Sequence, residues 1–414
     1  MKTLFKISIL LFFAALITTT SAQQAGWRGP GRSGVYNETG LLKSWPSSGP
    51  ALLWEITGIG NGYSSVTVTD DAIYITGAHD GKDFLTALTQ DGKTKWKVEY
   101  GKIGTKNYPE SRCTPTYYNG KLFVISGQGD LACISKDGKL LWTVNHYQKY
   151  DATEQRFGIS ESPLVVDNKV IATPAGRKAF MVAFNIENGA VIWETPVIEE
   201  GAMYANPLLI EFNGVKTIVT YSQKYIVGIS AADGKVLWKF DYESVNDEHR
   251  GRNHINTPLY RDGYIAAGNG YGQTGVKIKL NPGKDPSFVW KNPNFNPHVG
   301  GMVLLGNYIY NSTHDNNNMG RWVCIDWNTG ETKWITQWNN KGSIIAADGM
   351  LYIYEEKGGN VALIRPDPSK LDVVSSFKIT KGDGPHWAHM VIDKGRLFIR
   401  HGDYLAAFSI KAGK

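Results

Sequence analysis

Histidine, arginine and tyrosine side chains gather just before the short strands of this sequence, where they could move protons around an anionic molecule. The densest stretch is residues 251–259, "GRNHINTPL", which places Arg252, His254 and Asn256 immediately before an apolar strand. An imidazole gains or loses a proton near neutral pH, and a guanidinium grips a carboxylate with two parallel hydrogen bonds. The stretch therefore predicts a polar site for an anion.

The same position recurs in other strands, which can be aligned on the proline that several of them share. Upstream of this proline position most residues are tyrosine, arginine, lysine or histidine, which are typical of binding and catalysis rather than of core packing. All histidines of the sequence map to loops on the same face of the predicted fold. We expect the side chains at this position to form a ring around a polar funnel, since binding sites are commonly built from loops on a rigid scaffold. The position is held by Tyr63, Arg112, Ser160, Tyr204, Ile255, His298, Lys341 and His386.

We predict two sets of site residues in this funnel. A histidine abstracts a proton or activates water and a tyrosine protonates the leaving oxygen, and cations neutralise the carboxylate of an acidic sugar. Such a site belongs to a lyase or hydrolase that acts on a polysaccharide fragment. The predicted catalytic residues are His254, His298, His386, Tyr63 and Tyr204. The predicted substrate-binding residues are Arg112, Lys341, Arg252, Asn256, Asn206, Glu161, Trp387, His314 and Arg400.

The sequence gives no specific metal site. A divalent metal held by histidines, with Asp315 or Glu161 as an oxygen ligand, remains open, but no H-E-x-x-H spacing supports it. The "HWAH" at residues 386–389 places two histidines three apart, so on a strand they would point to opposite faces. We therefore assign no metal ligand.

The elements that position these residues come from an internal repeat. Each repeat contains a turn such as "DGKTKW" (91–96) or "DGKVLW" (233–238), with alternating apolar strands before it. Units of about 40 to 50 residues with four short strands predict the blades of a β-propeller. We therefore predict an all-β, eight-bladed propeller of four-stranded antiparallel blades, in which an early strand with Trp54 joins the C-terminal blade and closes the ring. The outer strands are marked by Trp54, Trp96, Trp142, Trp193, Trp238, Trp290, Trp334 and Phe377.

The repeat, seen in "ALTQDGKTKW" and "CIDWNTGETKW", resembles that of the PQQ-like propellers over roughly residues 50–410. This superfamily includes quinoprotein alcohol dehydrogenases and the propeller subunit of the outer-membrane barrel-assembly machinery. The resemblance implies the fold and leaves two further functions open: a non-catalytic scaffold for cell-envelope assembly, or a PQQ-dependent dehydrogenase with Trp387 or Trp322 stacked on the quinone. The dehydrogenases carry adjacent cysteines and a calcium site, whereas the cysteines here, Cys113, Cys133 and Cys324, are far apart in sequence.

The N-terminal residues indicate where the protein is located, and the composition limits the partners that it can have. Residues 1–22 place two lysines before an apolar run that ends in small residues, which is typical of a secretory signal. We expect a Gly/Pro-rich lead at 23–49 that wraps the surface, followed by the propeller at 50–414. The protein is then secreted or periplasmic and monomeric, without a membrane span. The net charge of +6 is too mild to indicate a nucleic-acid partner, and a protein partner remains open.

Overall fold

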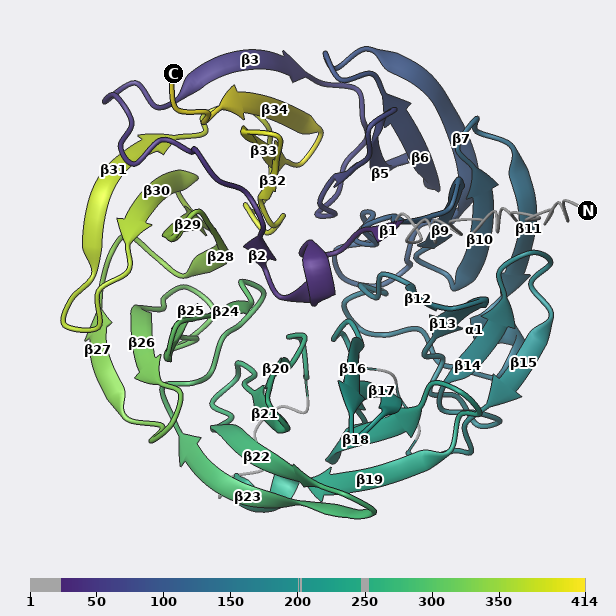
Figure 1. Ribbon diagram of the computed structural model, residues 1–414. Helices are drawn as coiled ribbons and strands as arrows, with labels where there is room; N and C mark the ends of the chain where they lie inside the picture. Colours follow the sequence, from purple (N-terminus) through teal and green to yellow (C-terminus); the bar gives the residue numbers. More distant parts are fainter. Residues whose placement is uncertain (1–23, 200, 202, 247–252, 414) are drawn as a thin grey trace, which may run out of the picture.

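The computed structural model describes residues 24–199, 201, 203–246 and 253–413, and these form a ring of eight antiparallel sheets (Figure 1). Every sheet has four strands of its own, and two sheets gain a fifth, short strand from the N-terminal lead. The predicted eight-bladed propeller is confirmed. Within the described residues, no helix is long and apolar enough to cross a membrane. The predicted signal at 1–22 and Arg252 lie outside the described residues.

The strands of each blade follow in order from the inner to the outer edge. Blades 1 and 2 contain β4 (Thr67–Val68), β5 (Ile73–His79), β6 (Lys82–Leu88) and β7 (Thr94–Lys102), then β8 (Thr116–Tyr118), β9 (Lys121–Ile125), β10 (Asp130–Ser135) and β11 (Leu140–Asn145). Blades 3 and 4 contain β12 (Leu164–Val166), β13 (Lys169–Ala172), β14 (Val182–Asn185) and β15 (Val191–Glu194), then β16 (Leu208–Phe212), β17 (Val215–Tyr221), β18 (Tyr225–Ser230) and β19 (Val236–Asp241).

The second half of the ring repeats this order. Blades 5 and 6 contain β20 (Leu259–Arg261), β21 (Tyr264–Ala267), β22 (Gly275–Asn281) and β23 (Lys284–Asn292), then β24 (Met302–Leu305), β25 (Tyr308–Ser312), β26 (Trp322–Asp326) and β27 (Thr332–Thr336). Blade 7 contains β28 (Gly342–Ala347), β29 (Met350–Glu355), β30 (Asn360–Arg365) and β31 (Asp372–Lys378). Blade 8 contains β32 (Val391–Asp393), β33 (Arg396–His401), β34 (Tyr404–Ser409) and, as its outer strand, β3 (Ala51–Ile56). Short helical turns form α1 (His146–Lys149), η1 (Pro30–Arg32) and η2 (Glu243–Val245).

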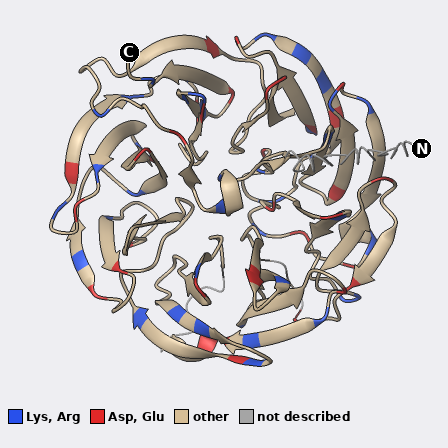
Figure 2. Cartoon of the chain, in the orientation of Figure 1, with Lys and Arg blue, Asp and Glu red and all other residues tan. Residues whose placement is uncertain are grey.

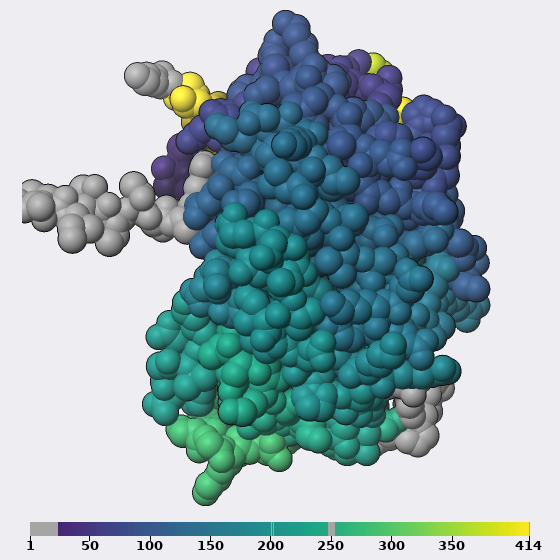
Figure 3. Space-filling view, turned by 90° about the vertical axis from the view of Figure 1, so that its right-hand side faces the viewer, coloured from purple at the N-terminus to yellow at the C-terminus, as the bar shows by residue number. Residues whose placement is uncertain are grey.

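The ring closes in blade 8, where the early strand β3 pairs with β34 near the C-terminus, as predicted. Closure of this kind joins the two ends of the chain and leaves no open gap between the first and last blades. Seen from the side (Figure 3), the blades follow one another without a break, from blue at blade 1 to green at the lower edge.

Most outer-strand tryptophans pack on a glycine of the next blade, which explains why the repeat pairs glycine with tryptophan. The Trp96 indole donates to the carbonyl of Lys136 at 3.1 Å, in the following blade. A methyl group built on Gly138 would lie 2.8 Å from the Trp96 ring, and Gly138 has a positive φ of 86°. Only glycine satisfies both the turn and this close approach. The repeated motif is therefore structural.

The Gly/Pro-rich lead lies in the central channel, and the expectation that it wraps the surface is wrong for its first half. β1 (Gln24–Ala25) pairs with the inner strand β8, η1 crosses the centre, and β2 (Val35–Tyr36) pairs in parallel with the inner strand β28 (Figure 1). We call residues 24–36 the plug. The backbone edges of the inner strands face the channel, so a segment rich in glycine and proline finds hydrogen-bond partners there without side-chain alternation.

Two buried arginines fix the plug to opposite sides of the ring. Arg32 donates to the carbonyls of Ser162, Pro163 and Pro207 at 2.7 to 3.0 Å, in blades 3 and 4. Arg28 donates to the carbonyl of Met302 at 2.6 Å and contacts Nδ1 of His389 at 2.8 Å. Burial lowers the pKa of both guanidinium groups to about 10, so both remain cations at neutral pH.

Lysines and arginines mix with aspartates and glutamates along the outer strands (Figure 2). Such mixing fits the mild net charge of +6.

Candidate functional site

A cavity of about 610 Å³ opens at the mouth of the channel, above the plug. Its walls come from the loops that precede the inner strands and from the loops between the second and third strands, and Trp27 and Arg28 of the plug line it as well. The plug therefore contributes to the site as well as to closure of the channel.

The structure brings together half of the predicted site residues around this cavity. The position upstream of the inner-strand proline supplies most of them because the equivalent loops of neighbouring blades converge on the axis. The predicted residues that line the cavity are Tyr63, Arg112, Tyr204, Asn206, Asn256, His298 and Trp387.

The other described residues of the prediction do not line the cavity. Arg400 donates to the carbonyls of Gly60, Thr76 and Gly402 and so ties blade 8 to blade 1, which leaves it no free face for a substrate. Glu161 accepts from the backbone and side chain of Thr173 at 3.0 and 3.1 Å. Burial raises the pKa of Glu161 to about 7.

Three of the predicted histidines are also held inside the wall. His254 contacts the carbonyl of Gln223 at 3.0 Å and stacks on Tyr221. His386 contacts the hydroxyl of Tyr354 and stacks on His401, with ring centroids 3.6 Å apart. Burial first, and electrostatic repulsion from His401 next, lower the pKa of His386 to about 4. His314 lies behind His298, and burial lowers its pKa to about 4.

The two predicted asparagines are partly committed to the fold. Ser65 N–H donates to Thr114 Oγ1, Thr114 N–H to Ser162 Oγ, and Ser162 N–H to Asn206 Oδ1, so blades 1 to 4 are hydrogen-bonded in series near the channel. Asn256 donates both hydrogens of its amide, to the carbonyls of Gly268 and Pro297. Only the remaining amide groups of the two asparagines are available to a ligand.

Arg112 lies in an aromatic cage at one side of the cavity. Its guanidinium carbon is 5.2 Å from the Tyr63 ring centre, 5.9 Å from that of Tyr108 and 6.0 Å from that of Trp387. One nitrogen donates to the Tyr108 carbonyl at 2.9 Å, and Nε is buried without a partner. Burial lowers the pKa of Arg112, and nearby Tyr63 and Glu110 oppose that shift. A cation with unused donors beside flat rings suits a planar or ring-shaped anion.

The charge balance of the cavity is positive. Arg112, Arg156 and Lys357 line it, and none of these cations forms an ion pair with a carboxylate in the described part of the chain. Glu356 is the single carboxylate among the described residues of the lining. Its Oε1 lies 3.2 Å from Nζ of the buried Lys341. These unpaired cations could therefore bind an anionic ligand.

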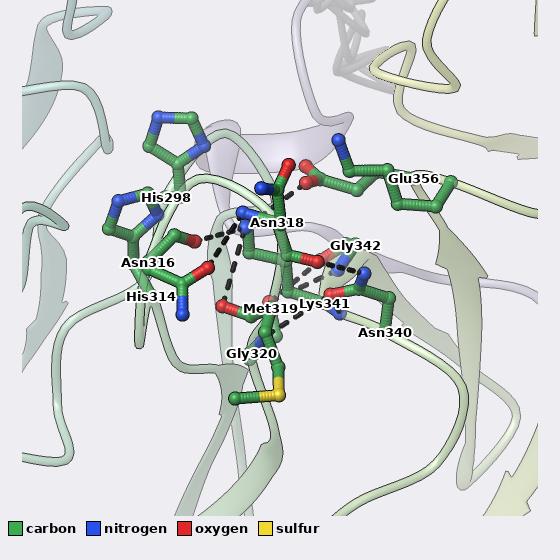
Figure 4. Close-up of polar contacts among 12 residues, drawn as sticks. His298, His314, Asn316, Asn318, Met319, Gly320, Asn340, Lys341, Gly342 and Glu356 are labelled. Carbon is green, nitrogen blue, oxygen red and sulfur yellow. Dashed lines mark hydrogen bonds and ion pairs between the residues drawn. The ribbon is translucent and has the colours of Figure 1, made fainter.

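Lys341, predicted to bind substrate, is fully engaged inside the wall (Figure 4). Its ammonium donates to the carbonyl of Asn316 at 2.7 Å and to that of Met319 at 3.4 Å, and it pairs with Glu356. An ammonium has three hydrogens, so these contacts use all of them. Burial lowers the pKa of Lys341, and Glu356 opposes that shift.

Two histidines whose rings contact each other at a tilt lie beside this ion pair (Figure 4). The ring centroids of His298 and His314 are 4.4 Å apart. His298 Nε2 lies 3.0 Å from the hydroxyl of Tyr271, and its Nδ1 is buried without a partner. Burial first, with electrostatic repulsion from His314 and Lys341 next, holds the pKa of His298 well below its usual value. His298 is therefore a neutral imidazole at neutral pH.

Residues that the sequence reasoning missed complete the lining. The alignment on the inner-strand proline did not cover the loops between second and third strands, where Tyr271, Glu356 and Lys357 follow β21 and β29. The polar loop "EEKGG" was a usable signal, because the equivalent loops of other blades carry histidines. The missed residues are Trp27, Arg28, Tyr108, Arg156, Phe157, Asn253, Thr257, Tyr271, Val299, Gly301, Asn317, Asn318, Glu356, Lys357 and His389.

The fold and the repeat define an eight-bladed PQQ-like propeller with a polar cavity at its axis. The family model of the outer membrane protein assembly factor BamB matches residues 85–336, and the chain belongs to this family. The crystal structure of BamB from Moraxella catarrhalis superposes with a TM-score of 0.60 at 14% identity, over 87% of this chain and 99% of that one. The quinohemoprotein alcohol dehydrogenase of Comamonas testosteroni superposes with a TM-score of 0.64 at 11% identity, over 93% and 79%. These structures show the fold that the chain shares.

Sequence relatives cover less of the chain. An uncharacterized protein of Rickettsia conorii is 25% identical over 293 residues, 67% of this chain and 64% of that protein. The quinoprotein alcohol dehydrogenase PedH of Pseudomonas putida is 27% identical over 161 residues, 36% of this chain and 25% of that protein. The chain thus spans less than two thirds of the length of either relative.

The residues of the cavity do not fit the quinone site that the resemblance implies. Cys113, Cys133 and Cys324 are free and buried apart from one another, so they cannot form a disulfide between adjacent cysteines. In the described part of the chain, no group of three or more histidine, cysteine, aspartate or glutamate side chains is placed to hold a metal ion. Arg112 and Trp387 would suit an anionic ring, but they do not single out a quinone.

Proposed function

We propose that this protein binds an acidic saccharide, as its substrate, in the central cavity. One observation carries the proposal: Arg112, Arg156 and Lys357 line a cavity of about 610 Å³ without a carboxylate partner, next to aromatic rings. The volume falls in the range of roughly 300 to 1,000 Å³ that small-molecule sites occupy. Cations select the carboxylate and aromatic faces pack against the sugar ring, so the two features together favour an acidic sugar.

The test is a titration of the protein with a uronate oligosaccharide and with a neutral oligosaccharide of the same linkage. Binding can be followed by tryptophan fluorescence, because Trp27 and Trp387 line the cavity, and by calorimetry. We expect the uronate to bind and the neutral sugar to bind much more weakly. Arg112→Met should weaken uronate binding by roughly 10- to 100-fold, since a hydrogen bond to a charged group contributes about 1.5 to 3 kcal/mol.

Arg365→Met is the matched control. Arg365 pairs with Asp372 on the outside of blade 7, with 63% of its side chain exposed, far from the lining residues. Its loss should leave uronate binding unchanged. Equal affinity for the acidic and the neutral sugar, or equal effects of the two variants, would contradict the proposal.

A scaffold for cell-envelope proteins is the second candidate, in a secreted or periplasmic protein. Two observations favour it: the family match to an assembly factor, and apolar side chains on the outer strands, such as Leu53 (51% exposed) and Phe288 (50% exposed). Exposed apolar residues on an outer strand can take part in protein contacts. In a strain without the native gene, a scaffold would lose function with Leu53→Lys and Phe288→Lys and keep it with Arg112→Met.

A further inference from the structure

We propose that Tyr271 and Glu356 are the acid and the base of a β-elimination that cleaves an acidic saccharide bound in the central cavity. This inference rests on the proposed function and adds the reaction and its proton-transfer groups. Both residues line the cavity, and both follow the second strand of a blade, in blades 5 and 7.

Tyr271 is held in an unusual backbone conformation at the cavity wall. Its φ is +62°, a left-handed value that bulky side chains rarely adopt. Tyr108, on the same cavity, has a φ of +55°. Strained backbone at a bulky residue persists only where the surrounding structure holds it, and it is concentrated at functional sites. The strain therefore marks Tyr271 as a positioned group.

The hydrogen bond between Tyr271 and His298 frees the phenol hydrogen for the cavity. Nδ1 of His298 is buried without a partner, while Nε2 lies 3.0 Å from the Tyr271 oxygen. An unpaired buried N–H is rarer than an unpaired acceptor, so the hydrogen of the neutral ring belongs on Nε2. His298 then donates to the Tyr271 oxygen, and the O–H of Tyr271 is available to a substrate.

This arrangement suits a proton donor. When Tyr271 gives up its proton, the negative charge develops on an oxygen that already accepts a hydrogen bond from His298. Burial keeps His298 neutral, so it does not compete for that proton. Burial first, with nearby tyrosines and the charge of Glu356 among the lesser causes, raises the pKa of Tyr271, so the phenol is protonated at neutral pH.

One of the two carboxylate oxygens of Glu356 has no hydrogen-bond partner. Only 3% of the residue is exposed; Oε1 meets Lys341 at 3.2 Å, and Oε2 has no partner (Figure 4). Buried polar atoms in proteins are almost always hydrogen-bonded, so an unpartnered one calls for a reason. Lys341 keeps the carboxylate in place, and Oε2 is left with lone pairs that no protein group uses.

The environment of Glu356 strengthens it as a base. Burial raises its pKa, and the charge of Lys341 limits that rise. A carboxylate with a raised pKa accepts a proton more readily than one in water and is still ionised once the pH exceeds that pKa. Tyr271 and Glu356 thus have opposite tasks set by their surroundings, which is the usual signature of an acid and base pair.

The carboxylate count of the cavity favours elimination over hydrolysis. Glycosidases commonly use two carboxylates that flank the scissile bond, whereas Glu356 is the single one among the described lining residues. Elimination needs one base, one acid and cations that neutralise the substrate carboxylate, because that charge otherwise opposes loss of the neighbouring proton. Arg112 and Arg156 supply those cations.

In the proposed step, Glu356 removes the hydrogen on the carbon that bears the substrate carboxylate, C5 of a uronate. The electron pair of that C–H bond forms a C4=C5 double bond while the C4–O bond to the leaving sugar breaks. Tyr271 gives its proton to the departing oxygen. The resulting phenolate then recovers a proton from water as Glu356 releases its own, so no oxidant, reductant or further reactant is needed.

The experiment measures binding and product formation separately with 4-linked uronate oligosaccharides. The conjugated double bond is followed by its ultraviolet absorbance, and new reducing ends are counted in the same samples. We expect the native protein to form both in equal amounts. Tyr271→Phe and Glu356→Gln should each lower turnover at least about 100-fold, in line with the contribution of a general acid or base, while the dissociation constant changes less than about 3-fold.

Tyr118→Phe is the matched control, because Tyr118 is a partly exposed tyrosine of β8 outside the lining. Full turnover in Tyr271→Phe or in Glu356→Gln would overturn the role of that residue. Reducing ends without a double bond, or uronate binding without any product, would overturn elimination and leave the proposed function standing. Failure of the native protein to bind uronates would instead reject the proposed function.

The pH profile of the native protein decides the case if Glu356→Gln does not fold. Turnover should rise with pH through a single ionisation that lies above that of an ordinary glutamate, because the base must be ionised and burial raises its pKa. The charges of Lys341 and Lys357 act in the opposite direction, and Glu355 adds to the rise. A profile with no such ionisation would overturn the assignment of the base.

Discussion

Replacing Arg32 by methionine should release the plug from the channel. The buried guanidinium donates to the carbonyls of Pro207 at 3.0 Å, Ser162 at 3.0 Å and Pro163 at 2.7 Å. Hydrogen bonds from a charged donor contribute about 1.5 to 3 kcal/mol each. The variant no longer has to bury a cation, and this offsets several kcal/mol of the loss. Pro163 also keeps its hydrogen bond from Thr116 Oγ1 at 2.6 Å. The net loss should be about 2 to 4 kcal/mol of local stability.

Amide hydrogen exchange measures this loss where it occurs. Gly34 N–H donates to the Arg28 carbonyl at 2.9 Å, so it reports on opening of the plug. A loss of about 2 to 4 kcal/mol predicts exchange roughly 30- to 1,000-fold faster at Gly34, with little change in the outer strands. Arg365→Met, which removes one exposed ion pair, should change exchange at Gly34 by less than about 5-fold. Unchanged exchange in Arg32→Met would refute the assignment of Arg32 as the anchor.

Two further predictions concern the interior of the ring. Gly138→Ala should lower the free energy of unfolding by about 2 to 4 kcal/mol, because its methyl would meet Trp96 at 2.8 Å. The control is Gly120→Ala, which has a similar positive φ and nothing within 4 Å and should lower that free energy by about 1 to 2 kcal/mol. Equal losses in urea unfolding would reject the Trp–Gly contact as the cause. His146 is fully buried, and burial lowers its pKa from 6.5 to about 4. The unfolded chain therefore takes up this proton first, and the folded state loses stability as the pH falls from about 6.5 towards 4. His146→Phe should become more stable relative to the native protein by about 2 kcal/mol between pH 7 and pH 5, and a difference that does not change with pH would contradict this.

The fold was predictable because the repeated contact between a tryptophan and a glycine of the next blade produces a pattern in the sequence. Trp96 in one blade meets Gly138 in the next, and a substitution at either place disturbs both the turn and the packing between blades. A contact that needs the same two residue types in most blades produces a periodic sequence pattern. The mark also located the closing strand with Trp54, although that strand lies far from its blade in sequence.

The plug could not be predicted for the opposite reason. β1 and β2 have two residues each, so they show no alternation, and glycine and proline around them are as typical of an exposed segment as of one in a channel. Its anchors are Arg28 and Arg32, residue types that are rarely buried. Their burial follows from the carbonyl groups that the inner strands present to the axis, which depend on the closed ring.

The candidate site was predictable in place but only partly in its residues. Arg112 and Arg400 have the same side chain, and both were assigned to the substrate. Arg400 donates to the carbonyls of Gly60, Thr76 and Gly402 and to the hydroxyl of Ser64, whereas Arg112 uses one nitrogen and faces the cavity. The sequence specifies a donor and the loop that carries it, but whether the donor is already used depends on backbone carbonyls contributed by other blades.

The plug and the cavity must be considered together, because the same residues serve both. Gly301 has a φ of +71°, and a methyl built there would lie 2.5 Å from the guanidinium of Arg28. The missing side chain leaves room for Arg28 to reach His389, whose Nε2 meets the carbonyl of Val299 at 2.7 Å. His389 accepts from Arg28 on Nδ1 and donates from Nε2, so it stays neutral, and burial lowers its pKa to about 3. Through Arg28 and His389, the plug is therefore joined to blade 6 and blade 8 at the wall of the cavity.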